Sequence, residues 1–106
     1  MSNIKTIKIS TEFANTPKGR NHPADGPNTG QRFREELIEP FFNEYDKLII
    51  DLDDLYGCPS SFREEAFGGL ARKYGSKKVL DKLDFICTDE PPLIEVIIKD
   101  ILHAND

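Results

Sequence analysis

Residues 47–75 of the chain read KLIIDLDDLYGCPSSFREEAFGGLARKYG, and this stretch decides the fold. It opens with the apolar run Leu48–Ile50, which is rich in β-branched residues and typical of a strand buried on both faces of a parallel sheet. Three aspartates then end the apolar pattern, and the turn Tyr56–Pro59 breaks the chain with a glycine and a proline. The stretch therefore predicts a strand, a turn and a helix in that order.

The helix predicted after this turn has apolar residues at helical spacing and a glycine at its end. Ser61 can serve as its N-cap, because Glu64 follows at the spacing of a capping box, and Gly75 suits the position just after the last turn. Gly68 and Gly69 lie inside the helix, where each costs about 1 kcal/mol relative to alanine, and we expect them to allow close packing on the sheet. The apolar face consists of Phe62, Ala66, Phe67, Leu70, Ala71 and Tyr74.

The composition is that of a soluble globular protein, and it limits the classes of partner that the chain is expected to bind. With 106 residues the chain is long enough for one domain with one core, residues 1–106. Its 19 acidic and 14 basic residues give a net charge of −5, which argues against nucleic acid as a partner because phosphate binding needs a basic face. No apolar run approaches the ~20 residues of a membrane span. The N-terminus lacks an apolar signal region, so we expect a cytoplasmic protein without a membrane partner.

A first strand is predicted near the N-terminus, where Ile4, Ile7 and Ile9 are interleaved with polar residues. The segment Thr11–Phe13 either extends this strand or forms a second short one.

Residues 14–29 then form the longest irregular stretch, a loop rich in proline and glycine. Loops of this length are uncommon in compact domains and are often functional. Arg20, His22 and Asp25 make it a candidate ligand loop, in which Arg20 and His22 would face an anion near a helix N-terminus. The alternative is a solvated connection whose turns are set by its prolines.

A second helix is predicted after this loop. Asn28 or Thr29 can cap it, and Pro40 should kink it or end it early. Its apolar residues at helical spacing are Phe33, Leu37, Ile38, Phe41 and Phe42. The motif at 33–36, Phe-Arg-Glu-Glu, recurs at 62–65. Duplication is one explanation; the simpler one is that arginine beside glutamate solvates a first turn whose carboxylates suit the helix dipole.

The C-terminal third continues the alternation of helix and strand. Residues 76–82 predict one or two helical turns, and residues 83–87 a short strand. Thr88 or Asp89 can cap a last helix, with two prolines in its first turn. Its β-branched content leaves a strand at 94–98 as an alternative. Its broad apolar face, which packs on the sheet or leaves surface for a partner, consists of Leu93, Ile94, Ile97, Ile98, Ile101 and Leu102.

No cofactor site is evident in the sequence. Cys58 and Cys87 have no metal-ligand spacing, and we expect two reduced thiols that are buried or half-buried. There is no Walker motif and no GxGxxG after a strand, so a nucleotide site is unsupported. The order of elements predicts an α/β fold: one domain with a small mixed or mostly parallel sheet and helices packed against it.

The strand, the acidic exit, the Ser-Ser turn and the helix with small residues together resemble the centre of a STAS domain, the fold of bacterial anti-sigma-factor antagonists. In that family an Asp-Ser-Ser-Gly turn opens the helix, and its first serine is phosphorylated by a partner kinase. Here the turn reads Pro59-Ser60-Ser61-Phe62, so Ser60 matches the phosphorylated serine, while proline and phenylalanine replace the flanking aspartate and glycine.

A family of STAS-like bacterial domains is more similar still, over most of residues 5–98. The similarity is carried by Asp25-Gly26-Pro27, by GQRFREE at 30–36 and by SSFREEAFGGL at 60–70. Relatives of this type occur beside histidine-kinase-like ATPase domains. The resemblance therefore implies a single STAS-like domain and an ATPase partner.

Three functions follow from these observations. The first is a non-catalytic regulatory module that binds a histidine-kinase-like ATPase or another regulatory protein through Ser60, Ser61, Phe62 and Arg63, with Ser60 as a phosphorylation site; alternatively the two serines only cap the helix. The second is a metal-dependent enzyme that uses the strand exit Asp51, Asp53 and Asp54, although no complete catalytic constellation accompanies it. The third is a small assembly subunit that forms a homodimer through its last helix.

Overall fold

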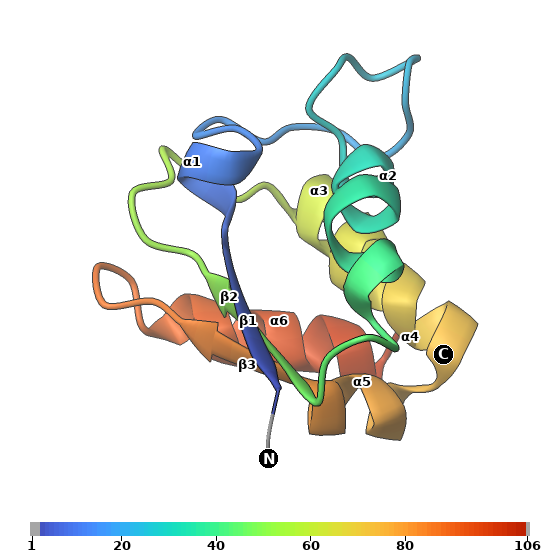
Figure 1. Ribbon diagram of the computed structural model, residues 1–106. Helices are drawn as coiled ribbons and strands as arrows, with labels where there is room; N and C mark the ends of the chain where they lie inside the picture. Colours follow the sequence, from blue (N-terminus) through green and yellow to red (C-terminus); the bar gives the residue numbers. More distant parts are fainter. Residues whose placement is uncertain (1–2, 106) are drawn as a thin grey trace.

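A three-stranded parallel sheet forms one layer of the computed structural model, which describes residues 3–105 (Figure 1). The strands β1 (Ile4–Lys8), β2 (Lys47–Asp51) and β3 (Leu83–Ile86) lie in the order β1-β2-β3. All three run in the same direction, with Ile7, Ile50 and Phe85 in register across the sheet. The predicted α/β class is confirmed, and the sheet is parallel rather than mixed.

The helices pack against one face of this sheet, and the other face is open. The covered face carries Ile7, Leu48, Ile50 and Leu83, which are all buried. On the opposite face Ile4 is 54% exposed, Ile86 is 38% exposed and Ile49 is half-buried. The prediction that β2 is buried on both faces is therefore wrong, because Ile49 is only half-buried between the exposed Ile4 and Ile86 of the neighbouring strands.

Strand β1 ends in a single helical turn, α1 (Ile9–Glu12), where the sequence suggested more strand at 11–13. The Glu12 carboxylate accepts a hydrogen bond from the Lys8 N–H (2.7 Å), and Ile9 is fully buried. These contacts turn the backbone away from the sheet, so the prediction of a strand at Thr11–Phe13 is wrong.

The second predicted helix consists of α2 (Gly30–Phe33), a π-helical segment η1 (Arg34–Ile38) and a 3-10 turn η2 (Glu39–Phe41). The hydroxyl of Thr29 accepts a hydrogen bond from the Arg32 N–H (3.2 Å), so Thr29 is the predicted cap. Pro40 lies in the 3-10 turn and ends the helix early, as expected.

The helix of the central stretch is continuous from residue 60 to residue 74, as α3 (Ser60–Arg63), the π-helical segment η3 (Glu64–Gly68) and α4 (Gly69–Tyr74). It begins after Pro59, and no side chain caps it, so the predicted capping box of Ser61 and Glu64 is wrong. The Glu64 carboxylate binds two arginines instead. Gly75 follows the last turn with φ +95°, as its position predicted.

The two helices approach each other closely through glycines. A methyl group at Gly30 would overlap the carbonyl oxygen of Phe62 and would lie 3.0 Å from the Ala66 nitrogen. At Gly69 it would overlap the guanidinium of Arg34. At Gly68 the added methyl group would meet the side chains of Glu64 and Arg72. The glycines inside the helix therefore make room for side chains. The expectation that they allow close packing on the sheet is wrong.

The core lies between this helix pair and the sheet, and aromatic rings dominate it. The Phe33 ring lies 5.7 Å from that of Phe62 and 6.2 Å from that of Phe67, centroid to centroid. Phe67 in turn meets Phe85 of β3 edge to face at 5.5 Å. Both repeated Phe-Arg-Glu-Glu motifs thus place their phenylalanine in the core.

The remaining helices are α5 (Ser76–Lys82) and α6 (Pro92–Leu102). Helix α6 packs beside the helix of residues 60–74, and its Ile97 and Ile101 are fully buried, so the alternative of a strand at 94–98 is wrong. It starts at Pro92, and neither Thr88 nor Asp89 caps it. Among residues 3–105, no helix has the length and apolar character that crossing a membrane requires.

Candidate functional site

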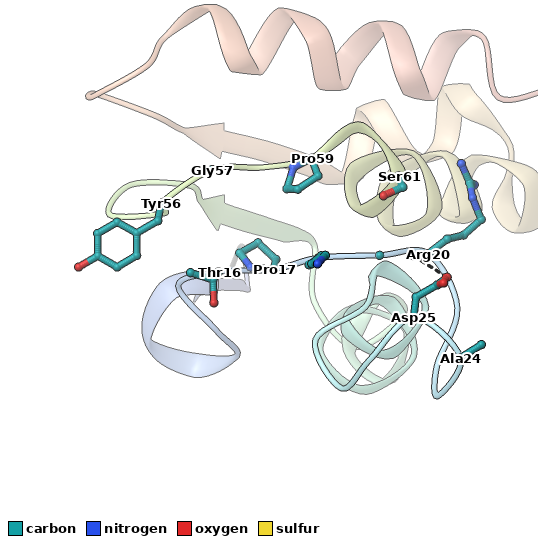
Figure 2. A pocket seen from close by; sticks show the side chains of 11 residues that line it. Thr16, Pro17, Arg20, Ala24, Asp25, Tyr56, Gly57, Pro59 and Ser61 are labelled. Carbon is teal, nitrogen blue, oxygen red and sulfur yellow. Dashed lines mark hydrogen bonds between the residues drawn. The ribbon is translucent and has the colours of Figure 1, made fainter.

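An open groove of about 930 Å³ runs along the end of the sheet at which the strands finish. Figure 2 shows the segment 16–25 along one wall and the turn 56–61 along the other. The structure thus joins two segments that the sequence identified separately, the long loop and the Ser-Ser turn. In open α/β sheets, ligands bind beyond the carboxyl ends of the strands, which is where this groove lies.

Backbone hydrogen bonds to the start of α2 order the long loop. The carbonyl oxygens of Gly19 and Arg20 accept from the N–H groups of Gly30 and Gln31, each at 3.0 Å. Just before these residues, the Lys18 N–H donates to the Asn28 carbonyl oxygen at 2.9 Å. The loop therefore satisfies N–H groups at the helix start that have no partner within the helix.

Two of the three predicted ligand-loop residues hold the shape of the loop. The Asp25 carboxylate accepts from the backbone N–H groups of Arg20 (3.3 Å) and Asn21 (3.0 Å). The His22 N–H donates to the side-chain oxygen of Gln31 (3.0 Å), and its imidazole Nδ1 lies 3.3 Å from the Gly26 carbonyl oxygen. Both side chains are exposed, and these contacts account for their positions.

The guanidinium of Arg20 faces two carboxylates. It pairs with Glu64 and, at 3.3 Å, with Glu65. Arg72 lies on the other side of Glu64 at 2.5 Å. Hydrogen bonds from Arg72 and then Arg20 lower the pKa of Glu64 to about 2, against partial burial, which raises it. The guanidinium of Arg20 is therefore paired with acids of the neighbouring helix, and binding of an anion by Arg20 stays a prediction.

A second set of ion pairs joins the two π-helical segments. Arg34, whose side chain is 13% exposed, pairs with Glu65 at 2.8 Å and with Glu39 at 2.9 Å. Arg63, the arginine of the second Phe-Arg-Glu-Glu motif, pairs with Asp100 of α6 at 2.7 Å. In both copies the arginine ties its helix to another element, so the repeat has a structural role.

The four residues predicted to contact a partner have different environments. Ser60 is exposed, and Ser61 is half-buried and lines the groove. Phe62 is 0% exposed and belongs to the core. Arg63 is half-buried, and besides its pair with Asp100 it donates to the carbonyl oxygen of Cys58 at 3.3 Å. Partner binding at the two serines stays a prediction; phenylalanine and arginine here position the turn.

The acidic strand exit connects the ends of the three strands. The Asp53 carboxylate accepts hydrogen bonds from the Thr88 N–H (2.7 Å), the Thr88 hydroxyl (2.8 Å) and the Asp89 N–H (3.2 Å). The hydroxyl of Thr88 contributes most to lowering the pKa of Asp53. Asp51 accepts from the Asp53 N–H (2.9 Å), and Asp54 pairs with Lys8 of β1 (2.6 Å). These contacts give each predicted metal ligand a structural partner.

A different set of metal-type donors does converge nearby. Asp53, Cys87 and Asp89 each contribute one possible ligand atom, and these three atoms lie within 4.8 Å of one another. Burial raises the pKa of the Cys87 thiol, which favours the protonated form over the thiolate that metals bind. The thiol donates to the Glu90 carbonyl oxygen at 3.1 Å. Hydrogen bonds within the protein therefore account for this cluster.

The site residues predicted from the sequence include Arg20, Asp25 and Ser61 of the groove but leave out most of its lining, Tyr56 and Pro17 among them. Tyr56 is 81% exposed at one end of the groove, and Pro17 is buried in its wall (Figure 2). An aromatic residue beside glycine in the turn after a buried strand was the available signal for Tyr56, because exposed aromatic residues at loop tips are typical of recognition surfaces.

The comparisons with known proteins give one match. Residues 29–92 match the family model described as STAS-like domain of unknown function (DUF4325). The matched range includes both helices of the pair, β2, the Ser-Ser turn and β3, whereas β1 and most of the long loop, with the segment Asp25–Pro27, lie outside it. No curated protein and no solved structure matches the chain.

Proposed function

This chain belongs to the family of STAS-like domains, and on that premise we propose that it is a non-catalytic regulatory module that binds a protein partner. The partner is a histidine-kinase-like ATPase or another regulatory protein, as the resemblance to anti-sigma-factor antagonists implies. Recognition takes place at the groove and at the exposed first turn of α3. No cofactor takes part.

The observation that carries this proposal is the position of the two serines. Ser60 is exposed at the first position of a helix that continues to Tyr74, and Ser61 lines the groove beside the long loop. A partner that binds the Ser-Ser turn therefore also contacts the long loop across the groove, so the two segments form one continuous recognition surface.

The surroundings of Ser60 suit a switch by phosphorylation. A phosphate adds about −2 charge, and the amino end of a helix favours negative charge. Glu64 and Glu65 lie one turn further along and would oppose it. Arg20, Arg34 and Arg72 pair with these two glutamates and offset their charge, which lowers the electrostatic cost of a phosphate there.

A pull-down from lysate of the native host tests the proposal. The baits are the wild-type chain, Ser60→Glu and Ser61→Ala. Arg63 is left unchanged because its pair with Asp100 is structural. Asn43→Glu is the matched control: it adds the same charge as Ser60→Glu at an exposed site just before β2, at the opposite end of the sheet.

The expected result is an ATPase or kinase that is retained by wild type and by Asn43→Glu and is lost with one or both serine variants. A partner that binds all four baits equally would remove the turn as the recognition site. Capture of no partner by wild type would argue against an interaction module.

The metal-dependent enzyme is distinguished by a separate measurement. A ligand that binds the native state raises the melting temperature. An interaction module without a metal site does not bind Mg²⁺, so Mg²⁺ should leave its Tm unchanged. A concentration-dependent rise that is lost in Asp53→Asn would favour a metal site at the strand exit.

A further inference from the structure

A ridge formed by Tyr56 and Gly57 separates two hollows at the carboxyl end of the sheet. The groove described above lies on one side. On the other side a second hollow of about 330 Å³ shares the ridge and is lined by Leu52, Leu55, Cys58, Asp89, Glu90 and Leu93. The backbone of the ridge is held by a hydrogen bond from the Tyr56 N–H to the Asn15 carbonyl oxygen (2.8 Å), while the ring itself is 81% exposed.

The two hollows differ in the charge that each leaves unpaired. The groove holds Lys18, which is exposed and whose ammonium has no hydrogen-bond or ion-pair partner within residues 3–105. The groove also holds Arg20, which is paired with Glu64 and Glu65, and Asp25, whose carboxylate accepts two backbone hydrogen bonds. The second hollow holds Asp89 and Glu90, both exposed. The Asp89 carboxylate accepts from the Asp54 N–H (3.0 Å), whereas the Glu90 carboxylate has no partner in the same part of the chain. An unpaired cation and an unpaired anion thus lie on either side of an exposed aromatic ring.

We propose that a second copy of this chain docks over the Tyr56 ridge around a two-fold axis. Around such an axis the same patch meets itself, so a residue on one side of the axis contacts the residue on the other side in the second copy. The two Tyr56 rings stack near the axis, and Lys18 of each copy faces Glu90 of the other. The result is an aromatic centre with a charged rim, the usual arrangement of a protein interface.

The distribution of charge selects a second copy over other occupants. An unrelated partner could be bound through a single charged hollow. A two-fold dimer instead requires a positive and a negative charge on the same chain, on opposite sides of an apolar centre, which is how Lys18 and Glu90 lie relative to Tyr56. Helix α6, the other candidate for self-association, has already buried Ile97 and Ile101 in the core and leaves Leu102 as its large exposed apolar residue. The inference does not rest on the proposed function, although a dimer of this kind would cover the groove.

Sedimentation velocity on the purified full chain tests this inference. Small interfaces are weak, so the concentration should run from about 5 µM to about 1 mM. We expect a concentration-dependent rise in mass from monomer to dimer. Lys18→Glu and Glu90→Lys should each raise the dimer Kd at least about tenfold, and Tyr56→Ala should do the same. These three side chains are exposed, and circular dichroism checks that each variant keeps its fold.

Charge exchange makes the test specific. An equimolar mixture of Lys18→Glu and Glu90→Lys should dimerise as well as wild type, because the two reversed charges then face each other. The matched controls are Lys77→Glu, whose side chain is 93% exposed on α5, and Glu44→Lys at the opposite end of the sheet; both should associate like wild type. A chain that stays monomeric throughout, single reversals that associate like wild type, or a mixture that fails to recover would each overturn the proposal.

Discussion

The carboxylate of Glu64 offers a sharp test of the ion-pair cluster beside the groove. Glu64→Gln removes the negative charge but keeps the shape of the side chain and an oxygen that still accepts hydrogen bonds. It therefore isolates the charge that Arg72 binds at 2.5 Å and that Arg20 binds from the long loop. We expect the variant to fold and to be less stable than wild type at neutral pH.

The magnitude follows from the pKa of this carboxyl. A decrease from its ordinary value of 4.5 to about 2 corresponds to about 3 kcal/mol of preference for the charged form in the folded state. The side chain of Glu64 is 29% exposed, and those of Arg20 and Arg72 are 40% and 36% exposed. Solvent screening of the arginines reduces the expected loss to about 1–2 kcal/mol.

The pH dependence of this loss separates charge from packing. Because the folded pKa lies below the unfolded one, the stabilisation is fully present above about pH 5 and is lost as the pH falls toward about 2. Urea denaturation at several pH values in this range should show the difference between wild type and Glu64→Gln shrinking as the pH falls. Glu36→Gln, whose side chain is 57% exposed in a pair with Arg32, is the control and should cost less than about 0.5 kcal/mol. An equal loss at neutral and low pH would refute the electrostatic explanation.

Three further predictions concern packing, capping and thiol chemistry. Gly30→Ala should lower the free energy of unfolding by about 1–3 kcal/mol, because the added methyl overlaps the Phe62 carbonyl oxygen; unchanged stability in urea denaturation would contradict this close approach. Thr29→Val keeps the shape of a fully buried side chain but removes the helix cap, and should cost about 1 kcal/mol in the same assay. Burial raises the pKa of Cys58 to about 12 and that of Cys87 above its usual range, so iodoacetamide should alkylate both far more slowly in the native chain than in urea, as mass spectrometry would show; fast native labelling would indicate an exposed thiolate.

The elements that local periodicity defines were predictable. The apolar run at 48–50 and the helical spacing after Pro59 each lie in the predicted element, and Gly75 follows the last turn of α4 as predicted. These patterns depend on neighbours in the sequence, which is why they could be read without the structure. The α/β class followed from their alternation.

The failures have a common physical cause, which is competition from tertiary contacts. Ser61 and Glu64 have the spacing of a capping box, but the carboxylate gains more from two arginines that come from the long loop and from the next turns of its own helix. Ile49 was predicted to be a core residue because it lies in an apolar run with Leu48 and Ile50, yet the face of the sheet on which it lies is open. The two π-helical segments likewise carry no local sequence signal that we identified.

The candidate site was predictable in parts and not as a whole. The long loop and the Ser-Ser turn were both identified, but nothing in the sequence showed that they form two walls of one groove. Arg20 was assigned to ligand binding because a loop arginine near a helix start suits an anion. Its actual partners, Glu64 and Glu65, lie on a helix whose position relative to the loop only the fold reveals.

The parallel pairing of β1 with β2 has a consequence during synthesis on the ribosome. Ile4 pairs with Lys47, so the first strand has to wait for 43 more residues before its partner exists. At about 5–20 residues per second, that delay is roughly 2–9 s. During this interval Ile4 and Ile7 have no sheet to join. The neighbouring Lys5 and Lys8 interrupt the apolar pattern, which limits association between nascent chains.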